Sequence, residues 1–193
     1  MIIGICGKMG VGKSTIANYI ATILPNTEII SCDRLFKESV EHHFVYERAI
    51  LDIFGSEEAV KDRKQLLALM VYFPNKAKQL NLVSAQIAYS AILNILSKKE
   101  FKGNYIIESG FLLQVPLKYI CDNIIYVYCN EKARQDRIFS RDSNKDEFTV
   151  KLLNDLTNTT SVYNNEFNGK IMLIDSGNEW HNSIKKEFEK FNE

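Results

Sequence analysis

The sequence predicts an α/β protein of three layers, in which helices pack on a five-stranded parallel sheet. Two observations carry this prediction. First, short apolar runs alternate with stretches of helical periodicity, as expected when helices join parallel strands by right-handed crossovers. Second, residues 34–100 contain helical patterns and no convincing strand. We therefore expect a core formed by residues 1–33 and 101–193, with a helical domain inserted at 34–100.

The expected strands are short apolar runs, of which the first breaks at a glycine and the second at a carboxylate. In chain order they are Ile2–Cys6, Glu28–Cys32, Tyr105–Ile107, Asn123–Cys129 and Lys170–Ile174. Continuous apolar runs of this length are typical of strands that are buried on both faces of a parallel sheet. The first run is therefore expected to be a central strand.

Helical periodicity accounts for most of the remaining chain. In Lys13–Leu24, apolar residues recur with a helical period and stop before Pro25. Further helices are expected at about 34–54, 63–72, 75–99, 131–140 and 179–191, and one more from the polar stretch at 141–147 to about residue 165. Gly55 follows the first helix of the insertion, and Pro74 begins the third.

The composition is that of an ordinary soluble globular domain and excludes several other classes. Of the 193 residues, 46% are apolar and 25% are charged, which argues against a disordered chain, a collagen-like repeat or a coiled coil. The 24 basic and 24 acidic residues balance, so we expect no binding to nucleic acid or to an anionic membrane. We expect a monomer or a weak homo-oligomer.

The expected compartment is the cytoplasm. The N-terminus lacks the basic segment and the cleavage site of a signal peptide. The cysteines have no zinc-binding spacing and are expected to be small buried side chains in a reducing compartment. The uncharged run Gln79–Ser97 is long enough to cross a bilayer, but seven polar residues interrupt it and would be costly in lipid. We expect this run to be a largely buried helix of a soluble protein.

Residues 7–14 match the phosphate-loop motif G-x-x-x-x-G-K-[ST] at every fixed position, between an expected strand and an expected helix. The glycines let backbone N–H groups face a polyphosphate, and the helix N-terminus adds positive charge. Lys13 can neutralise the β- and γ-phosphates, and Ser14 can ligate Mg²⁺. We therefore expect ATP with Mg²⁺ on this loop, bound by Gly7, Gly10, Val11, Gly12, Lys13, Ser14 and Thr15.

The phosphate loop alone does not separate a kinase from a GTPase or a transport ATPase. Asp52–Gly55 spells the D-x-x-G of GTPases, but it lies in the helical insertion with no strand before it. Asn144–Glu147 ends in Glu where the guanine-binding N-K-x-D ends in Asp, and the L-S-G-G-Q of transport ATPases does not occur. A kinase is favoured, and a nucleotide-binding switch without phosphoryl transfer is the alternative.

Asp33 is the candidate catalytic base. It directly follows the second expected strand, which is where small-molecule kinases of this class place a carboxylate. Such a carboxylate can orient the acceptor hydroxyl and take its proton. Alternatively, Asp33 caps the helix that follows, and the two roles are compatible. Glu108, which ends the third expected strand, is the rival carboxylate and could instead hold Mg²⁺ indirectly.

Arg134, Arg137 and Arg141 are spaced by three and four residues and share one face of an expected helix. Guanidinium groups can grip a polyphosphate and stabilise the charge of the transition state. The helix leads into a polar stretch that we expect to form a mobile lid at about 141–150. The alternative is a solvated helix face on which Glu131 and Asp136 are the partners of these arginines.

Taken in this order, these landmarks resemble those of the dephospho-coenzyme A kinase family over nearly the whole chain. Segments similar to the family's motifs are the phosphate loop, Ser31–Asp33, Ile53–Gly55 with Asp62, Arg63 and Leu66, the pair Arg137 and Arg141, and Ile174–Gly177. The resemblance implies a P-loop nucleotide kinase fold and an enzyme that uses ATP and Mg²⁺ to phosphorylate the 3′-hydroxyl of dephospho-coenzyme A. It also implies the roles of the site residues.

By this resemblance, Asp33 is the catalytic base, and Arg137 and Arg141 contact the phosphates. Lys13 and Arg137 would hold the γ-phosphoryl group during its transfer, and Asp175 would lie near the adenine of ATP. Residues 34–100 would bind the acceptor.

Four segments depart from the family's pattern. Its His-Pro falls on Ser84-Ala85, and its Pro-Leu-Leu-Phe-Glu falls on Gly110–Gln114. The Gln before its lid arginines is Arg134, and the Asn of its last-strand motif is Asp175. Several of these departures fall where the family binds its acceptor. A kinase of another nucleoside or nucleotide, and a protein that binds coenzyme A species without turnover, therefore stay open as alternatives.

Overall fold

The structure, a computed structural model, describes residues 1–40, 42–98, 103–114, 116–141 and 169–188. These residues form two compact units, one from residues 1–31, 103–141 and 169–188 and the other from residues 32–98. The expected lid beyond residue 141 and the expected helix up to about residue 165 lie outside the described residues.

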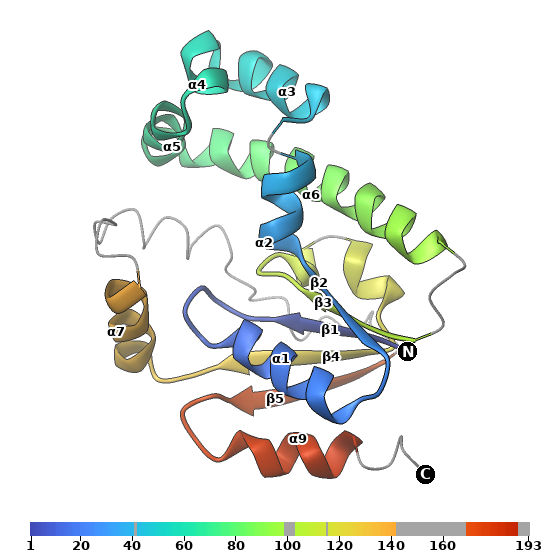
Figure 1. Cartoon of the computed structure of the whole chain (residues 1–193). Coiled ribbons are helices and arrows are strands. Elements are labelled where there is room, and N and C mark those ends of the chain that lie inside the picture. The colour runs from blue at the N-terminus through green and yellow to red at the C-terminus, as the bar shows by residue number, and fades with distance from the viewer. Residues whose placement is uncertain (41, 99–102, 115, 142–168, 189–193) are drawn as a thin grey trace. The chain divides into compact units, whose positions relative to one another are not determined.

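The first unit is built on a five-stranded parallel sheet, which confirms the predicted α/β class (Figure 1). Its strands are β1 (Ile2–Cys6), β2 (Thr27–Ser31), β3 (Asn104–Glu108), β4 (Asn123–Tyr128) and β5 (Lys170–Asp175). Their spatial order is β2-β3-β1-β4-β5, so β1 is the central strand, as its sequence predicts. In the register, Glu108 lies beside both Ile5 of β1 and Ser31 of β2. The carboxyl ends of these three strands therefore meet at one edge of the sheet.

Successive residues of β1 face opposite sides of the sheet. Ile3 and Ile5 are fully buried in a core shared with α1 (Lys13–Ile23) and α9 (Trp180–Phe188). On the other face, a Cβ at Gly4 would lie 2.9 Å from both Cys121 Sγ and a methyl carbon of Leu112. The glycine therefore allows the segment with the short helices η2 (Leu112–Gln114) and η3 (Pro116–Ile120) to pack directly on the strand backbone.

The cysteines only partly follow the sequence expectation of buried side chains. Cys6 and Cys121 are buried, whereas Cys32 and Cys129 are partly exposed. Burial raises the pKa of the Cys6 thiol to about 12, so this thiol is neutral at physiological pH. Cys32 and Cys129 each lie one residue beyond the end of a strand: Cys32 follows β2 and begins the short helix α2 (Cys32–Leu35), and Cys129 follows β4.

In the second unit, the described residues form helices and no strand, as predicted, but the first expected helix is interrupted. The segment expected as one helix at about 34–54 consists of α2 (Cys32–Leu35), a π-helical stretch (Phe36–Val40) and α3 (Phe44–Phe54). His43 explains the break. It has an extended backbone, and its ring nitrogen Nδ1 accepts a hydrogen bond from the Val45 N–H, which caps the start of α3.

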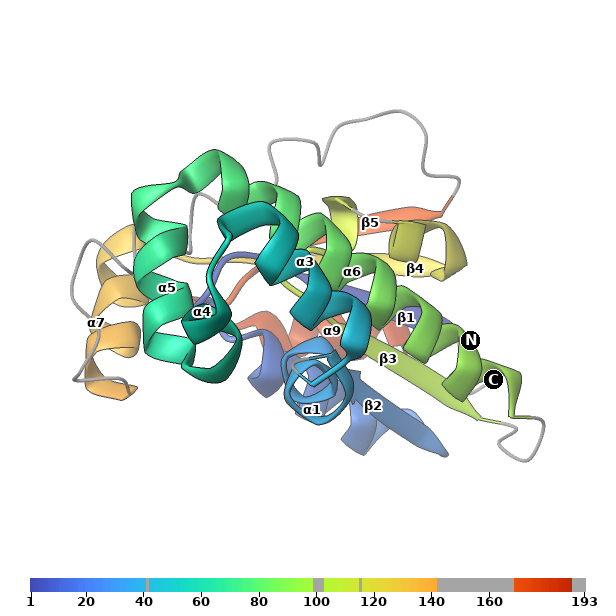
Figure 2. The same ribbon diagram turned by 90° about the horizontal axis from the view of Figure 1, so that it is seen from above.

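Three further helices complete the second unit: α4 (Glu57–Lys61), α5 (Arg63–Tyr72) and α6 (Pro74–Ser97). The side chains of Ser56 and Asp62 accept hydrogen bonds from the first turns of α4 and α5 and so define where these helices begin. The sequence analysis missed α4, because five residues are too few to show a helical period. Figure 2 shows α3 lying alongside α6, with which it packs.

Among the described residues, α6 is the one helix that is long and apolar enough to cross a membrane, judged by length and composition. Only 28% of its most apolar window is buried within the structure, so the expectation of a largely buried helix is wrong. Its buried residues are confined to a narrow set, Ala77, Leu80, Ala88 and Ile92. The polar residues that interrupt the run explain this, because they leave only part of the helix surface suited to packing.

Candidate functional site

The phosphate-loop motif forms the turn between β1 and α1. β1 ends at Cys6 and α1 begins at Lys13, so the predicted strand–loop–helix context is present. The three glycines of the motif, Gly7, Gly10 and Gly12, have φ angles of 143°, 82° and 95°. Residues with side chains rarely adopt such positive angles, so the curled path of this loop requires glycine.

Two of these glycines are also required by close packing. A Cβ at Gly7 would lie 2.2 Å from the carbonyl oxygen of Val127 in β4. A Cβ at Gly10 would lie 2.7 Å from Cγ1 of Ile138 and 3.0 Å from the carbonyl oxygen of Arg134, both in α7 (Glu131–Arg141). The loop therefore packs tightly against both β4 and α7.

Lys13 and Ser14 form the first turn of α1. Lys13 Nζ donates a hydrogen bond of 3.1 Å to the carbonyl oxygen of Lys8, at the other end of the loop. Ser14 Oγ donates a hydrogen bond of 2.6 Å to Oε1 of Glu108, whose side chain is buried at the end of β3. Thr15, the last residue expected to bind the nucleotide, is exposed. The structure thus brings the candidate magnesium ligand Ser14 together with Glu108.

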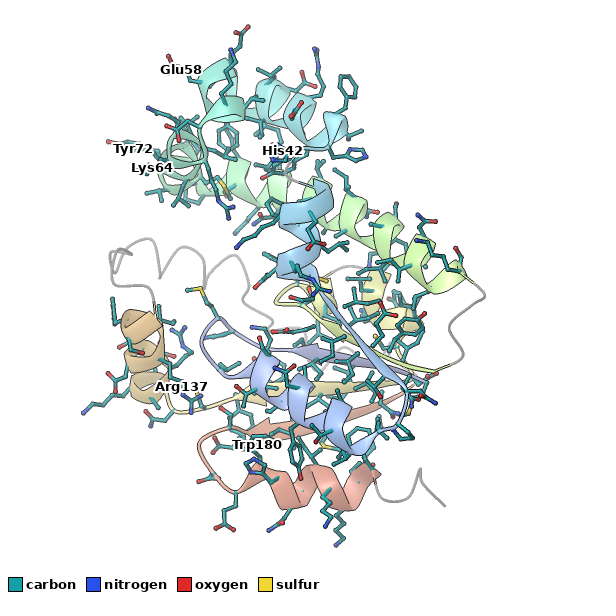
Figure 3. The ribbon with its side chains drawn as sticks, in the orientation of Figure 1. His42, Glu58, Lys64, Tyr72, Arg137 and Trp180 are labelled. Carbon is teal, nitrogen blue, oxygen red and sulfur yellow. The ribbon has the colours of Figure 1, made fainter. Side chains whose placement is uncertain are left out.

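Arg137 extends from α7 to the phosphate loop and to the turn after β5 (Figure 3). Its Nη1 lies 3.0 Å from Ser176 Oγ and 3.4 Å from the carbonyl oxygen of Val11, and its Nη2 donates to the Ser176 carbonyl oxygen at 3.3 Å. Ser176 Oγ itself donates to the same Val11 carbonyl at 2.5 Å. Arg137, Val11 and the turn after β5 are therefore joined in one hydrogen-bonded cluster.

Asp175 shapes this turn. Its Oδ1 accepts a hydrogen bond of 2.9 Å from the Gly177 N–H, and its Oδ2 accepts one of 2.7 Å from the side-chain amide of Asn178. These contacts fold the chain back immediately after β5 and present Ser176 to the phosphate loop. The structure thus places the Asp175 segment next to the loop residue Val11.

Arg134 pairs with Glu131, as the alternative interpretation expected, but it does not lie on a solvated helix face. Its side chain is only 3% exposed and forms an ion pair with Glu131 on the same helix. Its Nη1 also donates a hydrogen bond of 2.9 Å to the carbonyl oxygen of Met9 in the phosphate loop. The hydrogen bonds from Arg134 lower the pKa of the Glu131 carboxyl, which is therefore ionised at neutral pH.

Two further predicted residues are Asp33 and Arg141. Asp33 belongs to the second unit, where it is the second residue of α2 and has an exposed side chain. Because α2 begins at Cys32, Asp33 lies inside the first turn and does not precede the helix, so the interpretation as an N-terminal cap is wrong. Arg141 is the last residue of α7, and the described residues resume at 169.

The segments that spelled GTPase motifs do not form a guanine site in the described chain. Asp52 lies in the last turn of α3 and is paired with Arg48, and Gly55 ends the helix with a φ of 70°. The segment Asn144–Glu147 lies outside the described residues. The D-x-x-G string is therefore a helix C-terminus and not a loop that follows a strand.

The cluster has the chemistry of a polyphosphate site. A curled glycine loop leads into a helix N-terminus, and a lysine and an arginine donate hydrogen bonds to its backbone carbonyls. No group of three or more His, Cys, Asp or Glu side chains within the described parts of the chain could hold a metal ion. A hydroxyl and one carboxylate, as at Ser14 and Glu108, instead suit Mg²⁺ that takes its remaining oxygen ligands from phosphates and water.

Sequence reasoning missed Ser176 and underestimated Arg134. Ser176 lies in a segment that resembled the family motif, but a single serine after a strand carries no signal of its own. The pairing of Arg134 with Glu131 was among the sequence alternatives and is present, but the burial of Arg134 was not expected, because it depends on how α7 packs on the loop.

Comparisons with known proteins agree with this geometry. A family model described as dephospho-CoA kinase matches residues 1–159. A protein named dephospho-CoA kinase from Fusobacterium nucleatum subsp. nucleatum is 27% identical over 160 residues, which cover 79% of each chain. Proteins of the same name from Colwellia psychrerythraea and Prochlorococcus marinus are 29% and 26% identical. The first match covers 76% of this chain and 73% of the relative, and the second covers 95% and 93%.

Solved structures share the fold. The crystal structure of TT1252 from Thermus thermophilus superimposes with a TM-score of 0.67 at 17% identity and covers all of this chain and 96% of that one. A deoxyadenosine kinase from M. mycoides has a TM-score of 0.56 at 19% identity and covers all of this chain and 99% of that one. At these identities the likeness concerns the fold alone.

Proposed function

Because the chain belongs to the dephospho-CoA kinase family, we propose that it transfers the γ-phosphoryl group of ATP to the 3′-hydroxyl of dephospho-coenzyme A. It is an ATP-dependent phosphotransferase that acts on an alcohol. The observation that carries the proposal is the intact phosphate loop, with Lys13, Ser14 and Glu108 at its helical end, in a chain that matches the family over residues 1–159.

The loop residues Gly7 to Thr15 would bind the triphosphate through backbone N–H groups and the N-terminus of α1. Lys13 would exchange its contact with the Lys8 carbonyl for the β- and γ-phosphate oxygens. Arg137 and Arg141 would add positive charge from α7, and Asp175 would lie at the adenine end. This supply of positive charge stabilises the negative charge that spreads over the γ-phosphoryl oxygens during transfer.

Asp33 would act on the acceptor. In this mechanism the 3′-oxygen forms a bond to the γ-phosphorus, the bond between that phosphorus and the β,γ-bridging oxygen breaks, and ADP leaves. The proton of the hydroxyl passes to the Asp33 carboxylate. Support for this role comes from the position of Asp33 two residues after the end of β2, the strand whose last residue lies beside Glu108 in the register.

Ser14 would be the protein ligand of Mg²⁺, and Glu108 would orient it through the 2.6 Å hydrogen bond. When bound, Mg²⁺ would neutralise charge on the β- and γ-phosphates. The oxygen donors present here suit this ion, which binds few protein groups and keeps phosphate and water ligands.

The test is to offer the purified chain ATP labelled at the γ-phosphate, with Mg²⁺, and a panel of acceptors. The panel contains dephospho-coenzyme A, deoxyadenosine, deoxycytidine and nucleoside monophosphates. We expect the label to appear in the 3′-phosphate of coenzyme A, with one unlabelled ADP formed for each labelled product. If only a nucleoside or nucleotide product carries the label, the proposed acceptor is wrong and the chain is a P-loop kinase of another substrate. Binding of dephospho-coenzyme A without ADP release would show that the chain does not turn over.

A further inference from the structure

Three consecutive residues of the phosphate loop are held by α7. The carbonyl oxygen of Met9 accepts a hydrogen bond from Arg134, and that of Val11 accepts one from Arg137. Between them, Gly10 lies so close to Ile138 and to the backbone of α7 that a methyl group would not fit without displacement. These three residues of the loop are therefore fixed to one helix.

Arg134 is the buried member of this contact. Its side chain is 3% exposed, whereas the Glu131 side chain with which it pairs is 57% exposed. Its Nε and Nη2 donate to the two oxygens of Glu131 at 2.9 and 2.5 Å, and its Nη1 donates to Met9 at 2.9 Å. The planar guanidinium group thus binds both the Glu131 carboxylate and the Met9 carbonyl. A lysine, with its single ammonium group, cannot reproduce this geometry.

The position of the contact matters because the Met9 carbonyl belongs to the loop itself. A phosphate loop binds anions through N–H groups whose directions depend on where the adjacent carbonyl groups point. A charged hydrogen bond to one of these carbonyls restricts the loop before the nucleotide arrives. A loop that is already ordered loses less conformational entropy when it binds the nucleotide, and binding is therefore stronger.

We propose that Arg134, held by Glu131, is a positioning residue that orders the phosphate loop for nucleotide binding. This inference rests on the proposed binding of ATP to the loop. In the structure Arg134 binds a backbone carbonyl of the loop, so it acts on nucleotide affinity through the loop and leaves the chemical step largely unchanged.

The test compares Arg134→Met, Arg134→Lys and Glu131→Gln with the parent protein. Arg134→Met keeps much of the buried length but has no donor. We expect it to weaken binding of both ATP and ADP about tenfold by calorimetry, the change expected for the loss of one charge-assisted hydrogen bond. Arg134→Lys should recover part of this loss. Glu131→Gln should have a smaller effect, because Arg134 keeps its contact with Met9.

Steady-state kinetics separate positioning from general destabilisation. For Arg134→Met we expect the KM for ATP to rise about tenfold, with kcat within threefold of the parent and an unchanged KM for the acceptor. A merely structural role would lower the amount of active enzyme, and so kcat, while leaving both KM values unchanged. Gln135→Ala is the matched control, because Gln135 lies at an exposed position of the same helix and donates its side-chain hydrogen bond to the same Glu131.

The inference would be overturned if folded Arg134→Met bound ATP as tightly as the parent protein. It would also be overturned if Gln135→Ala lost as much ATP affinity as Arg134→Met. If Arg134→Met does not fold, the ranking of parent, Glu131→Gln and Arg134→Lys decides instead, and three equal affinities would overturn it. The calorimetry needs no acceptor. A parent that binds ATP but leaves dephospho-coenzyme A unphosphorylated therefore contradicts the proposed function and leaves this inference to be judged on the affinities.

Discussion

The hydrogen bond from Ser14 to Glu108 joins two residues that lie 94 positions apart in the chain. Glu108 reaches Ser14 because β3 is the neighbour of β1, so that the end of β3 lies beside the strand that leads into the phosphate loop. A carboxylate that is buried and bonded to a serine hydroxyl can orient that hydroxyl toward a metal ion. The proposed role of Ser14 as a magnesium ligand therefore predicts that this bond sets the magnesium concentration that activity requires.

We predict that Glu108→Gln raises the Mg²⁺ concentration needed for half-maximal activity about tenfold, as is usual when a partner of a metal ligand is altered. The amide can still accept the Ser14 hydrogen bond, so the change removes charge while keeping shape. The measurement is a magnesium titration at fixed ATP. Glu28→Gln, an exposed carboxylate on β2, is the control. An unchanged magnesium requirement would show that Glu108 only supports the fold.

Asp33→Asn tests the proposed base. We expect kcat to fall about 10²–10⁴-fold, because an amide cannot accept the proton of the hydroxyl, while ATP affinity stays nearly the same. Rapid-quench or steady-state assays give kcat, and calorimetry gives the affinity. Glu38→Gln removes another exposed carboxylate from the same unit and should be without effect. A kcat within threefold of the parent would reject Asp33 as the base.

At the scale of elements, α9 closes the core of the first unit over α1. Ile184 is fully buried there, and the Trp180 ring meets Tyr19 of α1 edge-on at 5.2 Å between centroids. α1 carries Lys13 and Ser14 in its first turn, so the packing of α9 supports the helix that presents them. The phosphate site therefore depends on a helix far from it in sequence.

We predict that Ile184→Ala lowers the free energy of unfolding by about 2–5 kcal/mol, the usual cost of removing a large buried aliphatic side chain. Asn182→Ala, on the exposed side of the same helix, should change it by less than about 0.5 kcal/mol. Denaturation in urea measures both. Equal effects of the two substitutions would mean that α9 does not pack as described.

The helices and strands also show which features of the fold can be predicted from the sequence alone. The strands and long helices were predicted because burial on both faces or on one stripe leaves a periodic record, as in β1 and α1. The break before α3 and the short α4 were missed, because they depend on single capping side chains, His43 and Ser56. The expectation that α6 is largely buried was wrong, because an apolar composition does not determine how much of a helix surface packs against other elements.

At the scale of the whole molecule, the phosphate loop could be found from sequence because its residues are contiguous, from Gly7 to Ser14. The contacts of Ser176 with Val11 and of Arg134 with Met9 could not, because they depend on which strands are neighbours and on how α7 approaches the loop. The roles of these residues follow from topology, which a single sequence does not display.

The division into two units makes one last prediction accessible. Trp180 is the single tryptophan of the chain and lies in the unit that contains the phosphate loop, so its fluorescence reports the unfolding of that unit. Magnesium–ATP at one hundred times its Kd should stabilise the folded state by about 2.7 kcal/mol and raise the Tm seen by Trp180 by roughly 5–10 °C. Lys13→Ala should lose most of this shift, because the ammonium group that neutralises the triphosphate is gone. A parent protein whose Tm does not respond to saturating ATP would contradict nucleotide binding at this loop, whereas an equal response in Lys13→Ala would place the nucleotide elsewhere.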